Sequence, residues 1–121
     1  MGQVDRRKFP RVHDEDLSLE LRLDDFDTVT HTLNISASGV YCKIPREIPL
    51  MSRVKIMLMI PTEMNGAPSI NTLEVTGVVV REHPVVIEGE TRHYDAAIFF
   101  DDLSPADREM IALYIARKKV S

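Results

Sequence analysis

Two arginines near the start of the chain have the type and spacing to bind guanine and phosphate. Arg7 and Arg11 enclose the run Arg-Lys-Phe-Pro-Arg, an RxxxR pattern. A guanidinium group is a planar fork that matches two acceptors at once, either O6 and N7 of guanine or two phosphate oxygens. Its plane can also stack on a purine face. Lysine has no such fork, so we expect arginine to be required at both positions.

A short polar run further along the chain offers complementary groups. Residues 34–39 read Asn-Ile-Ser-Ala-Ser-Gly, an NxSxxG pattern between two strand-like segments. The amide of Asn34 can accept from guanine N–H groups and donate to acceptors, and the Ser36 hydroxyl is close by. Gly39 allows the backbone to turn where a side chain would crowd a strand or a ligand. We therefore expect these groups at a sheet rim, beneath the basic arm.

Each pattern also has a simpler interpretation. An isolated RxxxR run is usually a set of solvated charges. An isolated NxSxxG run is usually a turn in which the Asn and Ser side chains bond their own backbone. The order of the two patterns, their spacing and the strands around the second favour a binding site.

Alternating apolar and polar residues predict the strands that hold these groups. From Leu17 to Leu23 every second residue is leucine, and this period of two predicts a half-buried strand. Gly77, inside a later strand pattern, predicts a bulge. Further strands are predicted at residues 29–34, 40–44, 54–60, 73–81, 85–87 and 91–100, with turns at 24–27, 36–39 and 88–90 and a loop at 62–69.

The end of the chain has a helical pattern. Ser104 is typical of an N-cap, Pro105 suits the first helical position, and Asp107 suits the positive end of the helix dipole. The apolar face is predicted to comprise Ala106, Met110, Leu113 and Tyr114, and the basic residues 117–119 suit the C-terminal end.

These elements predict a mainly β fold, a small antiparallel β-barrel of six or seven strands with a C-terminal α-helix. The length of 121 residues suits one domain, residues 1–121. Within it we expect a flexible basic N-terminal arm at 1–13, the barrel at 14–103 and the helix at 104–121.

Composition and charge exclude several functional classes. The net charge is −4, and the basic cluster at 6–11 is followed at once by acidic residues at 14–16. This distribution favours a small anion bound locally over a nucleic-acid polymer, whose backbone would meet repulsion elsewhere. No apolar run approaches the roughly 20 residues of a membrane span, and no signal peptide is visible at the start. With a single cysteine, Cys42, the chain suits the cytoplasm.

Catalytic and metal chemistry have little support. The four histidines are scattered, without the spacing of metal ligands. Ser36 has no neighbouring base pattern that would activate it as a nucleophile. We therefore expect a protein that is not an enzyme and that uses neither a metal nor a cofactor.

The RxxxR run, followed by the NxSxxG run in a chain of this size, resembles the PilZ domain family, bacterial receptors for the second messenger cyclic di-GMP. The resemblance implies that Arg7 and Arg11 bind guanine and phosphate, and that Asn34, Ser36 and Gly39 line the other side of the ligand. It covers nearly the whole chain, including the strand that ends in Val-Val-Arg at residue 81 and the strand at 97–100.

Two further positions bear on the resemblance. Arg6 resembles the arginine with which some family members hold a second ligand molecule, so two molecules of cyclic di-GMP per chain are expected. Ala97 stands where the family often has glycine, a position that we interpret as packing.

The resemblance implies a receptor whose surface changes when the ligand is bound. The altered surface would signal to a partner protein, which the sequence does not identify, or to a second copy of the chain in a homodimer. The alternative is a protein-interaction adaptor of the same fold that does not bind the nucleotide; the intact arginines argue against it. A barrel for single-stranded nucleic acid is a third possibility, but the chain has no tryptophan and a net negative charge.

Overall fold

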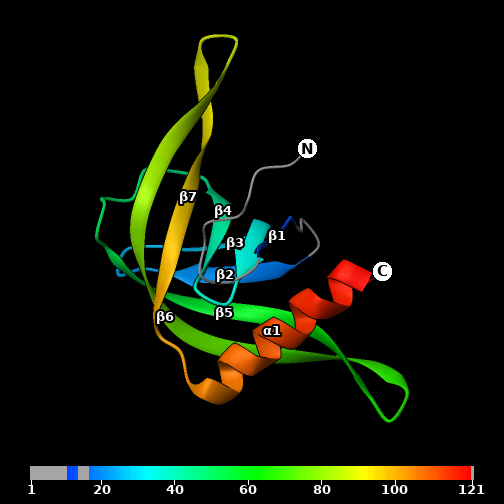
Figure 1. Cartoon of the computed structure of the whole chain (residues 1–121). Coiled ribbons are helices and arrows are strands. Elements are labelled where there is room, and N and C mark those ends of the chain that lie inside the picture. The colour runs from blue at the N-terminus through cyan, green and yellow to red at the C-terminus, as the bar shows by residue number, and fades with distance from the viewer. Residues whose placement is uncertain (1–10, 14–16, 121) are drawn as a thin grey trace, which may run out of the picture.

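The computed structural model describes residues 11–13 and 17–120, with side chains for residues 17–118. In this part of the chain, seven strands precede one helix (Figure 1). The strands are β1 (Arg11–His13), β2 (Ser18–Arg22), β3 (Asp27–Ser36), β4 (Gly39–Ile44), β5 (Arg53–Met64), β6 (Ala67–Ile87) and β7 (Glu90–Asp102), and the helix is α1 (Pro105–Val120).

The strands form a closed antiparallel barrel. The sheet order is β1-β3-β2-β5-β6-β7-β4, and an additional pairing of β3 with β4 closes a ring of six strands. The short β1 pairs with the C-terminal part of β3, whereas β2 pairs with its N-terminal part. The predicted antiparallel barrel with a C-terminal helix is confirmed.

Aliphatic side chains fill the barrel. Leu17, Leu19 and Leu21 are fully buried, as the period-two pattern predicts. They pack with buried residues from β3 to β7, among them Ile35, Val40, Ile56, Leu58, Val79 and Ile98. Because the interior of a small barrel is occupied by side chains, a ligand must lie on its outside or at its mouth.

The predicted loop at 62–69 is wrong, because β5 and β6 continue through it as a hairpin. Pro61 pairs with Ile70 and Pro68 with Glu63, and the turn at Asn65 and Gly66 has φ angles of 54° and 78°. Such a turn matches the twist of its flanking strands. The pairing of β2 with β5 ends at Met59, and proline is tolerated on strands that have an open edge.

The β6–β7 hairpin agrees with the prediction. The register shifts between Thr76 and Gly77, which is the predicted bulge, and the turn lies at Glu88 and Gly89. The two strands extend well beyond the barrel as a ribbon (Figure 1).

Helix α1 begins as predicted and buries part of the predicted face, since Met110 and Tyr114 pack against the core. The backbone N–H of Asp107 donates to the Ser104 hydroxyl at 3.1 Å, which is the expected cap. Ile111, Tyr114 and Ile115 are buried, whereas Leu113 is 56% exposed, so its predicted place on the packing face is wrong. The helix lies against β1, β3 and β5, and this contact selects the face centred on Ile111 and Ile115 (Figure 1).

Candidate ligand-binding site

The first strand brings one motif arginine to the second motif. Arg11 is the Cα partner of Ser36 and His13 is the partner of Asn34, in an antiparallel pairing of β1 with β3. Residues 11–13, which the sequence placed in the flexible arm, are therefore part of the sheet. Three residues are too few to produce a periodic pattern, so the sequence did not indicate this strand. Arg6 and Arg7 lie outside the described residues.

Ser36 has a local structural role in the turn that follows β3. Its side chain is fully buried, its Oγ accepts from the backbone N–H of Ser38 at 3.2 Å, and the two serine hydroxyls are 2.9 Å apart. The carbonyl of Ser38 accepts from the backbone N–H of Phe100 at 2.9 Å. These bonds tie the NxSxxG turn to β7 and give it a defined shape.

Gly39 is required by the close approach of β4 to β7. A Cβ atom at this position would lie 2.4 Å from the carbonyl oxygen of Ile98 and 3.3 Å from the Cα atom of Phe99. Both neighbours are backbone atoms, which cannot move aside as a flexible side chain would. Because the φ angle of Gly39 is not left-handed, steric crowding by the adjacent strand, and not the turn itself, explains the glycine.

A polar cluster lies on the outer face of β4, β6 and β7, next to the turn. The Tyr41 hydroxyl is 3.3 Å from Nε2 of His83, and Asp95 lies 3.7 Å from His83 and 3.3 Å from His93. Burial is the main cause that raises the pKa of Tyr41, with Asp95 adding to it and Arg81 opposing it. Tyr41 is therefore a neutral hydroxyl near neutral pH, held by the cluster.

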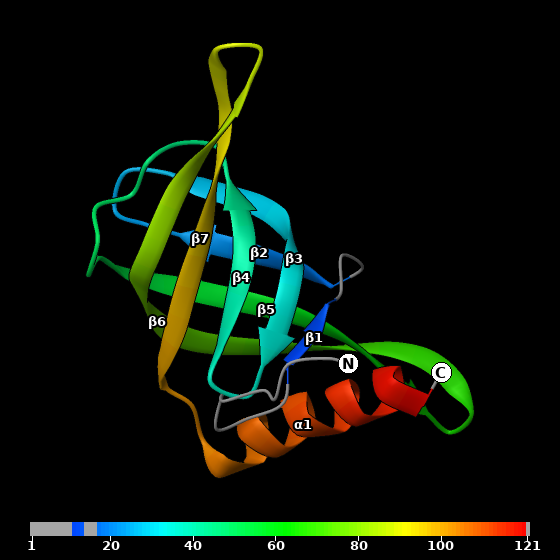
Figure 2. The ribbon, with the colours of Figure 1, turned by 45° about the horizontal axis from the view of Figure 1, so that its top comes forward.

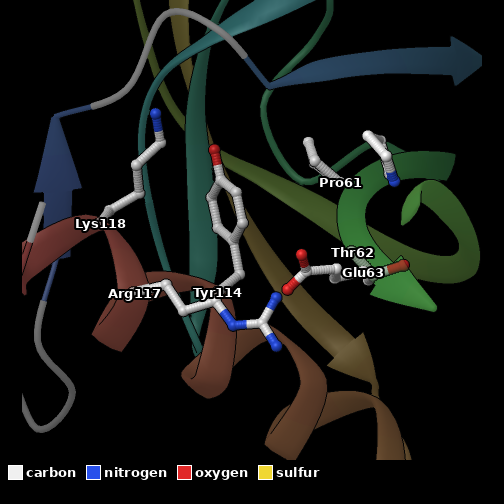
Figure 3. A pocket seen from close by; sticks show the side chains of 7 residues that line it. Pro61, Thr62, Glu63, Tyr114, Arg117 and Lys118 are labelled. Atoms are coloured by element: carbon white, nitrogen blue, oxygen red, sulfur yellow. The ribbon is translucent and has the colours of Figure 1, made fainter. Parts of the chain in front are cut away.

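A pocket of about 340 Å³ lies elsewhere, between the end of α1 and the β5–β6 hairpin (Figure 3). It is lined by Pro61, Thr62, Glu63, Pro68, Tyr114, Arg117 and Lys118. None of these residues belongs to either motif. Tyr114, Arg117 and Lys118 each interact with other residues already. The pocket therefore shares no lining residue with the described motif residues, although α1, which supplies three of its residues, also contacts β1 and β3.

Other chemistries find little support among the described residues. No group of histidine, cysteine or acidic side chains in residues 17–118 is arranged to hold a metal ion. Burial raises the pKa of Cys42 to about 12, so its thiol stays protonated. Within the described ranges, no helix has the length and apolar character to span a membrane.

Fold and site together define a small closed barrel with a terminal helix and a candidate site on the outside of the sheet, where β1, β3, β4 and β7 meet. The family model of the PilZ domain matches residues 5–117. The chain belongs to the PilZ domain family, and the resemblance seen in the motifs is confirmed. PilZ domain proteins are receptors or adaptors for cyclic di-GMP and not enzymes. No curated protein sequence matches the chain.

Solved structures share the fold at low sequence identity. The inhibitor of motility MotI/DgrA of Bacillus subtilis is 16% identical, with a TM-score of 0.80. The match covers 99% of this chain and 54% of the MotI/DgrA chain. MrkH of K. pneumonia in its c-di-GMP complex is 16% identical with a TM-score of 0.72, covering 97% and 53%. The PilZ domain of YcgR from Escherichia coli with c-di-GMP is 16% identical with a TM-score of 0.63, covering 96% and 98%. The chain thus spans about half the length of the first two.

Sequence reasoning missed two exposed or half-exposed side chains beside the turn, Tyr41 and Arg81. The strand register places them on either side of Ala97, because both are its Cα partners. The outward position of Tyr41 follows from the period of two in β4, whereas Arg81 is exposed because the register of β6 shifts between Val79 and Arg81. Neither this shift nor the register between strands that are distant in sequence is visible in the local pattern.

Proposed function

We propose that the chain is a receptor for cyclic di-GMP that binds the nucleotide on the outer face of the barrel at the NxSxxG turn. The observation that carries this proposal is the register of β1 on β3, which sets the second arginine of RxxxR opposite Ser36. Two motifs separated by more than twenty residues are thereby neighbours at one sheet edge. The family and the c-di-GMP complexes of MrkH and YcgR, which share the fold, support the choice of ligand.

The residues have distinct proposed roles. Arg7 and Arg11 supply guanidinium forks for guanine and phosphate. Asn34 contributes its amide, while Ser36 and Gly39 shape the turn and let the ligand approach its backbone. Ser36 is buried in the turn, so its contribution to the ligand is mainly through the backbone that it holds.

Arg6 extends the site to a second ligand molecule. Two molecules of cyclic di-GMP bring four phosphate charges together, and their repulsion must be offset. A third guanidinium next to Arg7 can contact the second molecule and stack on its guanine.

The output of binding is a changed surface. Ligand held by residues 6–11 would cover the outer face beside β4 and β7 and so alter its shape and charge. A partner protein that prefers the covered face would then bind the liganded form, or a second copy of the chain would do so. We place this receptor in the cytoplasm, with a small nucleotide and not a nucleic-acid polymer as its ligand.

Calorimetric titration of the purified chain with cyclic di-GMP tests the proposal. We expect a dissociation constant in the low-micromolar range or below, about 8 kcal/mol or more of binding free energy. The absence of both heat and a thermal shift at saturating ligand would refute it and favour an adaptor that does not use the nucleotide.

A further inference from the structure

Five residues on the outside of β4, β6 and β7 form a continuous surface next to the NxSxxG turn. Gly39 is the Cα partner of Phe99, and Ala97 is the partner of both Tyr41 and Arg81. Side chains of directly opposite residues project to the same face of an antiparallel sheet. Val40 and Ile98, the chain neighbours of the β4 and β7 members, are buried in the core, so Gly39, Tyr41, Ala97 and Phe99 face outward. Arg81 is exposed although Val79, two residues earlier, is buried, because the register of β6 shifts between these two residues. We call Gly39, Tyr41, Ala97, Phe99 and Arg81 the outer floor.

The middle of the outer floor is lower than its sides, where the aromatic rings of Tyr41 and Phe99 stand. Four of these residues form a square on β4 and β7, because Gly39 is opposite Phe99 and Tyr41 is opposite Ala97. Gly39 and Ala97 stand at two opposite corners, and Tyr41 and Phe99 stand at the other two. Small side chains therefore separate the two aromatic ones. Phe99 is 52% exposed, so much of its ring is accessible from outside the barrel. A planar base can rest on the small residues and stack on an exposed ring.

Strand order places this surface directly beside the motif residues. Asn34 on β3 is the Cα partner of Tyr41, so one row of partners crosses four strands through Asn34, Tyr41, Ala97 and Arg81. Figure 2 shows β3, β4 and β7 side by side, with β1 next to the end of β3. A ligand held at Asn34 on β3 would therefore meet Tyr41 on the next strand, at the edge of the outer floor.

Arg81 differs from most other described arginines in having its charge available. The side chains of Arg22, Arg46, Arg53 and Arg92 each pair with a carboxylate of Glu20, Asp25, Asp101 or Glu90. Among residues 17–118, Arg81 is exposed and makes no hydrogen bond or ion pair. An unpaired guanidinium at the edge of a surface with two aromatic rings suits a nucleotide, in which a sugar links the phosphate to the base.

We propose that the outer floor is part of the ligand site, where one guanine of the dinucleotide lies on Ala97 against Tyr41 or Phe99 and Arg81 binds the neighbouring phosphate. This inference rests on the proposed function, since it assigns further residues to the same ligand. It makes Tyr41, Phe99 and Arg81 binding residues that neither motif contains. His83, whose Nε2 lies 3.3 Å from the Tyr41 hydroxyl, then acts as a positioning residue, and Asp95 lies 3.7 Å from the same nitrogen.

We would titrate the parent, Arg81→Ala and Arg92→Ala with cyclic di-GMP in a calorimeter. The comparison distinguishes a direct contact of Arg81 with the ligand from long-range attraction by its charge. Both variants remove one exposed arginine from neighbouring strands, but Arg92 pairs with Glu90 on the projecting ribbon. We expect Arg81→Ala to weaken binding roughly tenfold or more, the scale of a hydrogen bond between charged groups, and Arg92→Ala to change it less than about twofold. Equal effects of the two variants would overturn the inference.

Filling the low area gives a second, independent test. Ala97→Leu places a branched side chain between the rings, and we expect it to weaken binding more than about tenfold because the base can no longer lie flat. Thr72→Leu is the matched control, an outward residue of β6 remote from the outer floor, and is expected to bind like the parent. Parental affinity of Ala97→Leu would overturn the inference. If Ala97→Leu fails to fold, the Arg81→Ala comparison decides.

The two proposals fail in different ways. A parent chain that does not bind cyclic di-GMP overturns the proposed function and this inference together. A parent that binds, with Arg81→Ala and Ala97→Leu binding equally well, overturns only the outer floor.

Discussion

Two places on the molecule could receive a small anion, and they differ in what surrounds their cations. The pocket between α1 and the β5–β6 hairpin is concave, but Arg117 and Lys118 interact with other residues and Glu63 contributes a negative charge (Figure 3). The outer face at the NxSxxG turn is open, but its turn is fixed by hydrogen bonds, and Arg81 has no carboxylate partner within residues 17–118. An anion needs unpaired donors on a rigid support, so we expect the outer face, and not the concave pocket, to bind it.

The largest effect is expected for Gly39, where β4 packs closely against β7. Gly39→Val should destabilise the fold by about 3 kcal/mol and abolish binding, because a Cβ atom would lie 2.4 Å from the Ile98 carbonyl oxygen. Urea unfolding measures the stability. Gly89→Ala, at a left-handed turn with open space around it, is the comparison and should cost about 1 kcal/mol. A Gly39→Val protein with the parental melting temperature would contradict the steric argument.

The next largest effect is expected for the two motif arginines at the outer face. Arg7→Ala and Arg11→Ala should each weaken cyclic di-GMP binding by about 1.5–3 kcal/mol, the range for hydrogen bonds to charged groups. Arg→Lys at either position should be nearly as damaging, since lysine has no planar fork. Titration calorimetry gives both values.

Arg117→Ala serves as the matched control for these variants, because it removes the same charge at the pocket. It should leave ligand affinity within about twofold of the parent. A larger loss in Arg117→Ala than in Arg11→Ala would move the site from the outer face to the pocket.

A smaller effect is expected for Ser36→Ala. The substitution removes the acceptor of the Ser38 N–H bond and should cost about 1 kcal/mol of stability. Binding should weaken less than in the arginine variants, because the hydroxyl acts on the turn and not on the ligand directly. Chemical unfolding and titration of the same variant compare the two quantities. A loss of affinity as large as that of Arg11→Ala, with parental stability, would assign the hydroxyl a direct contact.

The effect of Arg6 is a change in stoichiometry. We expect two molecules of cyclic di-GMP per chain in the parent and one in Arg6→Ala, because the second molecule loses the guanidinium that offsets its phosphates. The fitted ratio of ligand to chain measures this. One ligand per parent chain would reject the role of Arg6 in holding a second molecule.

Local patterns in the sequence predicted the elements that depend on local chemistry. The alternation of leucines at 17, 19 and 21 predicted a strand, and Ser104 predicted the start of α1, because burial on one face and capping act within a few residues. The prolines at 61 and 68 misled the prediction, because their tolerance depends on an open strand edge that only the tertiary arrangement creates.

The site was predicted only as far as its motifs extend. The sequence indicated Arg11 and Ser36 separately, and the register of β1 on β3 makes them neighbours. Tyr41 and Arg81 were not predicted as site residues, since their proximity depends on β4, β7 and β6 being adjacent in the sheet. Pairing between distant strands is a property of the whole barrel and leaves no local signal.

The position of the ligand on the molecule is tested most directly by amide NMR spectra recorded during a titration with cyclic di-GMP. The outer-face site predicts the largest shifts at Ser38, Gly39 and Ala97, with little change at Glu63 and Tyr114 beside the pocket. Shifts centred on Glu63 and Tyr114, with Gly39 and Ala97 unmoved at saturating ligand, would contradict it.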